Sequence, residues 1–141
     1  TWTRSTCGAK TQINRVCFAD EDNGWAAGWE GTIIRTKDGG ATWQAQKSPI
    51  NAWLTSLQFD SAGRGWITAD NALLVSEDSG ENWRLVDVPE TPFLVRLLRV
   101  NETLWAVGQY AVLRQTSDGK QWERVESLQA ATRASTAASQ P

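Results

Sequence analysis

The sequence contains no histidine and no methionine, and it has only one tyrosine and two cysteines among its 141 residues. Without histidine, most zinc sites, the histidine-dependent catalytic triads and the usual general base near neutral pH are excluded. The two cysteines, Cys7 and Cys17, form no CxxC motif, so we expect no metal site and no cofactor. Their spacing leaves open whether they form a disulfide.

Strong charge of one sign and long apolar runs are also lacking. The 14 Lys and Arg residues stand against 16 Asp and Glu residues, a net charge of -2. This balance excludes a general nucleic-acid binder, because phosphates need a basic surface. No apolar run is long enough for a membrane-spanning helix, and a hydrophobic fraction of 40% excludes a disordered chain. Because no initiator methionine is present, we expect a processed mature protein or a piece of a longer one.

Tryptophan, in contrast, is abundant, and most of the nine tryptophans recur with a period close to 40 residues. The repeated segments are Gly24–Trp43, Gly65–Trp83 and Leu104–Trp122. The tryptophans that close these segments lie 40 and 39 residues apart. Self-similarity at such a period indicates a repeat architecture.

Each repeat begins with a run of β-forming residues and continues with three further short strands. The first runs are Ile13–Phe18, Leu54–Phe59 and Val95–Val100. Four short strands in about forty residues are typical of a β-propeller blade. We therefore predict an all-β fold with three complete blades of four antiparallel strands, at about residues 13–47, 53–88 and 94–126.

The two ends of the chain fall outside these blades. Trp2 is in register with the tryptophans that close the repeats, so residues 1–4 are predicted to be an orphan strand from a preceding blade. Residues 127–141 are predicted to be a flexible low-complexity tail. Three blades leave sheet edges and half of a core open. We therefore expect the partners to include either missing propeller blades or further copies of the chain.

The turn before the last strand of each repeat carries an Asp, a Gly and a Trp. The Asp side chain can accept hydrogen bonds from turn N–H groups, the Gly allows a positive φ, and the Trp is an apolar wedge. We therefore expect structural roles for these residues, which lie too far apart for the paired carboxylates of a glycosidase. They are Asp38, Gly40 and Trp43; Asp78, Gly80 and Trp83; and Asp118, Gly119 and Trp122.

This turn matches the Asp box, or bacterial neuraminidase repeat. The wider frame of Gly24–Trp43 resembles the photosystem II assembly and stability factor family of β-propellers, and the resemblance covers residues 1 to about 126. It implies an exported, non-enzymatic module that binds a protein or peptide client. Asp boxes also occur in sialidases and related propellers, so a carbohydrate-binding or sialidase-like function is the alternative. A sialidase needs a tyrosine nucleophile, and Tyr110 is the one tyrosine available.

Four aromatic residues lie outside the repeating positions, in loops that share one face of a propeller. We expect a partner surface there, on Trp29, Trp53, Phe93 and Tyr110 together with Glu30. The alternative is that Trp29 and Trp53 cover a seam between blades.

Arginines form the second group of candidates. Arg15, Arg96 and Arg99 fall in the first strands of their blades, which line the central channel of a propeller. Arg35 and Arg114 match the I-x-R-T frame of the assembly factor family, whose arginine-rich face is thought to hold its client. The resemblance therefore implies a binding role for them, and bracing of neighbouring strands is the alternative.

Overall fold

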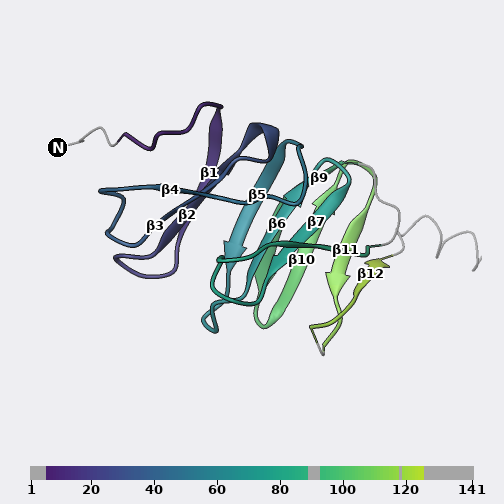
Figure 1. Cartoon of the computed structure of the whole chain (residues 1–141). Helices are drawn as coiled ribbons and strands as arrows, with labels where there is room; N and C mark the ends of the chain where they lie inside the picture. The colour runs from purple at the N-terminus through teal and green to yellow at the C-terminus, as the bar shows by residue number, and fades with distance from the viewer. Residues whose placement is uncertain (1–5, 89–92, 118, 126–141) are drawn as a thin grey trace, which may run out of the picture.

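The computed structural model describes residues 6–88, 93–117 and 119–125, which form three four-stranded sheets (Figure 1). The predicted orphan strand at residues 1–4 and the predicted tail at 127–141 lie outside the described residues. The first sheet contains β1 (Ile13–Phe18), β2 (Gly24–Gly28), β3 (Ile33–Thr36) and β4 (Gln44–Gln46). The second contains β5 (Leu54–Phe59), β6 (Gly65–Ala69), β7 (Ala72–Ser76) and β8 (Arg84–Val86). The third contains β9 (Leu94–Val100), β10 (Thr103–Gly108), β11 (Val112–Gln115) and β12 (Trp122–Val125).

Each sheet is an antiparallel meander whose strands follow one another in chain order. The three sheets stand side by side in the order of the sequence, and their first strands β1, β5 and β9 are neighbours (Figure 1). This arrangement confirms the predicted all-β fold with blades of four antiparallel strands. We refer to the sheets as blades 1, 2 and 3.

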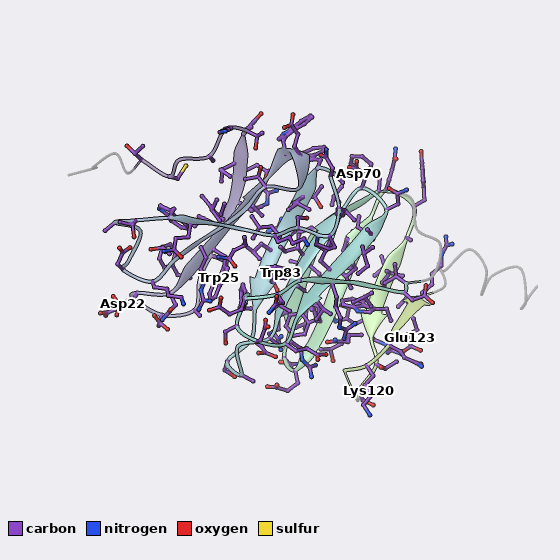
Figure 2. The ribbon with its side chains drawn as sticks, viewed as in Figure 1. Asp22, Trp25, Asp70, Trp83, Lys120 and Glu123 are labelled. Atoms are coloured by element: carbon purple, nitrogen blue, oxygen red, sulfur yellow. The ribbon has the colours of Figure 1, made fainter. Side chains whose placement is uncertain are left out.

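Two apolar seams hold the blades together. The seam between blades 1 and 2 contains Trp25, Leu57, Ile67 and Trp83, and Figure 2 shows the two tryptophans close together between the sheets. The seam between blades 2 and 3 repeats the arrangement with a second set of residues, Trp66, Leu73, Leu97, Leu113 and Trp122. Side chains alternate between the two faces of a strand, so blade 2 packs one face on blade 1 and the other on blade 3.

Hydrogen bonds between blades supplement the apolar contact. The Thr55 hydroxyl donates to the backbone carbonyl of Leu94 at 2.7 Å, and the backbone N–H of Leu97 donates to the Ser56 hydroxyl at 3.1 Å. Both polar side chains are buried. From positions in β5, these side chains form hydrogen bonds with backbone groups of blade 3. The bonds therefore fix how blade 3 is aligned along blade 2, in addition to holding the two blades in contact.

Candidate functional site

Three of the aromatic residues predicted to share a face lie in direct contact. The rings of Trp29 and Trp53 are stacked with centroids 5.3 Å apart, and Phe93 meets Trp53 edge-on at 5.8 Å. The fourth, Tyr110, lies in the loop whose Gln109 N–H donates to the carbonyl of Phe93 at 3.0 Å. These residues, one from each blade or blade connection, form a surface that we call the aromatic rim.

Backbone hydrogen bonds between consecutive segments position the rim. Trp29 begins a short 3-10 turn, Trp29–Gly31, between β2 and β3. The Trp29 N–H donates to the carbonyl of Gln12, and the Gly31 N–H donates to the carbonyl of Ala52, next to Trp53. Glu30 has φ 56°, a left-handed conformation that side chains seldom adopt without support. The turn is therefore fixed from both sides, and it presents Trp29 and Glu30 at the surface.

The rim is open to solvent at its two ends and closed in its middle. Trp29 is 45% exposed and Tyr110 is 69% exposed, whereas Trp53 and Phe93 are half-buried. The indole N–H of Trp53 is buried and has no hydrogen-bond partner among the described residues. Exposed aromatic rings have the chemistry of an interface, where a partner can bury their area. Because the stack joins blade 1 to blade 2, the same ring pair also covers their boundary.

The predicted arginines are not gathered in one place. Arg15 and Arg96 are exposed on first strands, paired with Ala27 and Val107 in the register, close to the strand ends that lead into the rim. Arg99 lies toward the opposite strand end and stacks over Trp66 at 5.5 Å. Sequence reasoning grouped these three as channel residues, whereas the structure separates the first two from the third.

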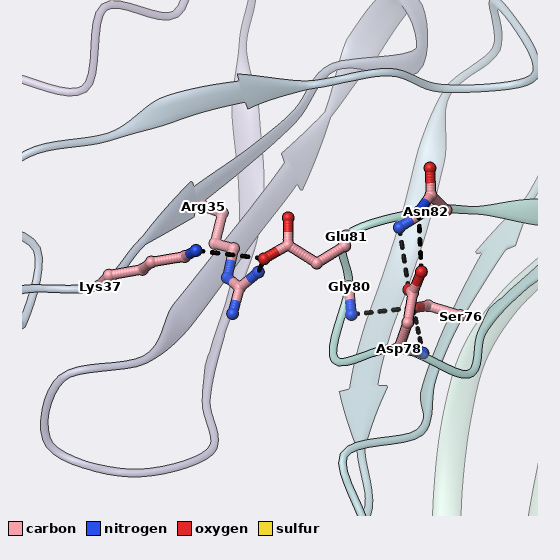
Figure 3. Close-up of polar contacts among 7 residues, drawn as sticks. All are labelled: Arg35, Lys37, Ser76, Asp78, Gly80, Glu81 and Asn82. Carbon is pink, nitrogen blue, oxygen red and sulfur yellow. Dashed lines mark hydrogen bonds and ion pairs between the residues drawn. The ribbon is translucent and has the colours of Figure 1, made fainter.

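Arg35 lies in the seam between blades 1 and 2, where it is 8% exposed. Its guanidinium stacks over Trp25 at 5.1 Å and forms an ion pair with Glu81 of blade 2, which also pairs with Lys37 (Figure 3). The two cations lower the pKa of Glu81, and the hydrogen bond from Lys37 is the largest cause. The position leaves Arg35 little surface for a client, and the bracing role is the one that these contacts support.

The Asp-box turns are built around their carboxylates. Asp78 accepts hydrogen bonds from the backbone and the side chain of Asn82 at 2.9 and 2.8 Å and from the Ser76 hydroxyl at 2.8 Å (Figure 3). These bonds, first of all the one from the Asn82 side chain, lower the pKa of Asp78 to about 2. Asp38 repeats the pattern with Thr42 and Thr36, and its pKa is also lowered to about 2. Asp118 of the third box lies outside the described residues.

A second polar surface, which sequence reasoning missed, lies between blades 2 and 3. A cavity of about 360 Å³ is lined by Arg64, Trp66, Arg99 and Glu102 among others. Arg64 and Arg99 each place a guanidinium over the Trp66 ring, at 5.7 and 5.5 Å. The sequence gives only a weak signal for it, because Arg64 stands before the Gly-Trp pair of repeat two, where repeat one has Asn23.

Cys7 and Cys17 are unpaired, and burial raises the pKa of the Cys17 thiol. Within the described residues, no group of three or more His, Cys, Asp or Glu side chains could hold a metal ion. The same residues contain no helix that is long and apolar enough to cross a membrane.

Repeated four-stranded blades, with Asp-box turns before their last strands, define an Asp-box β-propeller array. The chain belongs to the family described as photosynthesis system II assembly factor YCF48, whose model matches residues 1–124. The resemblance that the Asp-box frame indicated is thereby confirmed.

Relatives of the chain are photosystem II assembly factors by description. It is 31% identical over 125 residues to the photosystem II assembly lipoprotein Ycf48 of Synechococcus sp. (strain CC9902), covering 81% of this chain and 37% of that protein. It is 32% identical over 77 residues to the chloroplastic photosystem II stability/assembly factor HCF136 of Arabidopsis thaliana, covering 48% of this chain and 19% of that protein. The chain therefore spans less than two fifths of the length of these relatives.

Solved structures share the fold. YCF48 bound to D1 peptide superposes with a TM-score of 0.73 at 24% identity, covering 84% of this chain and 40% of that one. YCF48 from Cyanidioschyzon merolae gives a TM-score of 0.66 at 22% identity, covering 86% and 40%. An ancestral GH74 enzyme gives 0.68 at only 12% identity, covering 82% and 18%. Enzymes and assembly factors thus share this blade architecture, so function has to be argued from surfaces.

Proposed function

We propose that this chain is a non-enzymatic module of photosystem II assembly that binds a peptide segment of its client on the aromatic rim. The observation that carries the proposal is the stacked pair Trp29 and Trp53 with Phe93 edge-on, half open to solvent. Family membership supports the biological setting. The printed title of one related structure, YCF48 bound to D1 peptide, suggests the class of ligand.

The chemistry of the rim suits an extended peptide with apolar side chains. Trp29 and Tyr110 offer ring faces, and an extended segment can lay alternate side chains on them. Arg15 and Arg96, on the strands that lead into the rim, can receive a carboxylate of the client, since the guanidinium fork matches carboxylate geometry.

The enzymatic alternative has less support. A sialidase needs several arginines converging on one carboxylate beside a tyrosine. Here Tyr110 is on the rim, Arg35 is held in a seam by Glu81, and Arg99 stacks on Trp66 near the opposite strand end.

The name lipoprotein for one relative and chloroplastic for another support an extracytoplasmic, thylakoid-associated location for this chain. Fractionation of cells that carry the intact protein tests that location.

A titration of the chain with a synthetic D1 peptide, followed by calorimetry, tests the function. We expect Trp29→Ala to weaken binding by about tenfold or more, the scale of an interface anchor. Leu85→Ala is the matched control, because Leu85 is exposed on β8 of blade 2, away from the rim. Unchanged binding by Trp29→Ala would remove the rim from the proposal, and failure of the parent chain to bind any D1 segment would remove the function.

A further inference from the structure

The end of the aromatic rim that blades 1 and 2 form carries an open tryptophan ring. Trp53 stacks against Trp29 with centroids 5.3 Å apart, and Trp29 is still 45% exposed. An open indole face attracts cations, because its π electrons make the face negative. Within the described part of the chain, no arginine or lysine lies over the Trp29 ring.

The seam between blades 1 and 2 shows how this chain itself binds a cation. The Arg35 guanidinium lies over Trp25 at 5.1 Å and pairs with the carboxylate of Glu81 (Figure 3). The ring face and the carboxylate together replace the water that the guanidinium loses on burial. A tryptophan face with a carboxylate beside it is therefore a cation site in this molecule.

Glu30 supplies a carboxylate at the rim. It follows Trp29 directly, so the two Cα atoms are about 3.8 Å apart, and it is exposed. Its side chain forms no hydrogen bond and no ion pair with any described residue. The tryptophan face and the carboxylate of a cation site are thus both present at the rim, whereas the cation is not supplied by the described chain.

The backbone holds Glu30 in a conformation that is unfavourable for a residue with a side chain. Its φ is 56° and its ψ is 35°, a left-handed conformation that glycine adopts at less cost. The turn is closed by other groups, because the Thr32 N–H donates to the carbonyl of Trp29 at 3.0 Å and the Thr11 hydroxyl donates to the same carbonyl at 3.2 Å. A carboxylate is therefore held in a strained position without a use inside the described chain, which is typical of binding sites.

A second carboxylate lies in the equivalent loop of blade 2, between β6 and β7. The backbone carbonyl of Asp70 accepts the Leu94 N–H at 3.0 Å, next to Phe93 of the rim. One oxygen of the Asp70 carboxylate is buried and accepts no hydrogen bond from a described residue. Figure 2 shows Asp70 at the end of the strands opposite Lys120. The same end of the rim therefore carries two negative charges that no described cation neutralises.

The other end of the rim is basic. The Arg124 guanidinium donates to the carbonyl of Tyr110 at 3.1 Å, and Arg96 is exposed on β9 of the same blade. Lys10 and Arg15 are exposed in blade 1 or just before it, and neither forms an ion pair with a described residue. The charge along the rim therefore changes sign between blade 1 and blade 3.

We propose that Trp29, Glu30 and Asp70 form a subsite for a basic side chain, lysine or arginine, of the client peptide. The cation lies over the open face of Trp29, Glu30 pairs with it, and Asp70 adds a second negative charge. An apolar side chain at this end would remove water from the carboxylates without replacing it. The subsite rests on the proposed function of the rim, and it adds the charge and the direction of the ligand.

Three short peptides test the subsite on the 141-residue chain. They are acetyl-Leu-X-Leu-amide in which X is lysine, arginine or norleucine, which has the carbon chain of lysine without its charge. Dissociation constants come from NMR titrations that follow the indole N–H signal of Trp29. We expect the two basic peptides to bind about fivefold more tightly than the norleucine peptide or better, the combined scale of an exposed cation–π contact and an exposed ion pair.

Variants of Glu30 separate binding from folding. Glu30→Gln removes the charge and keeps the size, so the preference for the basic peptides should fall to about twofold or less while the norleucine peptide binds as before. Glu30→Gly should lose the preference too, and its melting temperature should be equal to or above that of the parent, because glycine relieves the strained φ. Glu21→Gln is the matched control and should keep the preference. Glu21 is an exposed glutamate of the same blade and is next to Asp22, which Figure 2 shows far from Asp70.

The outcomes separate the subsite from the function of the rim. If the norleucine peptide binds the parent as tightly as the basic peptides, the subsite is overturned and the rim remains a peptide site. A preference that survives unchanged in Glu30→Gln, or that is lost in Glu21→Gln, overturns the subsite as well, because the charge then acts from another place. If neither these peptides nor the D1 peptide shifts the Trp29 signal, the proposed function fails together with the subsite.

Discussion

At the scale of single residues, the Asp-box carboxylates act on the backbone around them. Asp78 holds Asn82 by its backbone and side-chain N–H groups and accepts the Ser76 hydroxyl, and the Ser76 hydroxyl in turn accepts the Gly80 N–H at 2.8 Å. Gly80 closes the seam on Trp25. The surface carboxylate of Asp78 therefore positions the buried contact between Gly80 and Trp25 through two hydrogen bonds, both of which involve the Ser76 hydroxyl.

We expect Asp78→Ala to lower the free energy of unfolding by about 1–2 kcal/mol, the scale of a lost side-chain cap and its hydrogen bonds. Asp78→Asn, which keeps an acceptor oxygen, should lose less. Urea titrations of the two variants and the parent measure both differences. If Asp78→Ala unfolds like the parent but loses its peptide ligand, the turn belongs to a binding site and the structural role assigned here is wrong.

At the scale of elements, the two Asp-box turns with described carboxylates are both expected to lose stability in acid. Asp38 and Asp78 have folded-state pKa values of about 2, below the ordinary 3.8. A carboxyl whose pKa is lowered by folding stabilises the fold fully above its ordinary pKa, and that contribution is lost as the pH falls through the folded value. Stability should therefore fall between about pH 4 and pH 2, within the range where these groups take up protons.

Melting temperatures of the parent and of a double variant, Asp38→Asn with Asp78→Asn, measure this effect. The variant should melt lower than the parent near neutral pH and lose less on acidification. Some loss should remain, because Asp20 and Glu81 also have lowered pKa values. Parallel acid profiles of the two proteins would assign the sensitivity to other groups.

The strands themselves could be predicted because the sequence repeats the same four-strand pattern three times. Runs such as Ile13–Phe18 and Leu54–Phe59 are short, and one copy alone would be ambiguous, but a shared period removes the ambiguity. The face that carries Trp29 and Trp53 followed from loop type. The ion pair of Arg35 with Glu81 could not be predicted, because its partners are 46 residues apart and meet only when two blades pack. The stacking of Phe59 on Trp25 could not be predicted either, because these two residues also meet only when the blades pack.

At the scale of the whole molecule, the blades form a one-dimensional array in which each described blade contacts its chain neighbours. The stability of such an array is a sum of blade terms and seam terms, so weakening one seam should loosen one end selectively. The seam between blades 1 and 2 offers a clean test, because one Asp-box turn carries two glutamates with different partners. Glu81 pairs across the seam with buried Arg35, whereas Glu77 pairs with exposed Arg84 within blade 2.

We expect Glu81→Gln to speed the exchange of amide hydrogens in β1–β4 several-fold relative to those in β9–β12, because it leaves the Arg35 guanidinium in the seam without its counter-charge. Glu77→Gln removes the same charge from the same turn, but its ion pair is exposed on both sides and contributes little, so exchange should stay as in the parent. Hydrogen exchange followed by mass spectrometry resolves the two ends of the chain. Uniform acceleration across all three blades would mean that the array unfolds as one unit, and equal effects of the two variants would mean that the seam ion pair does not couple blade 1 to blade 2.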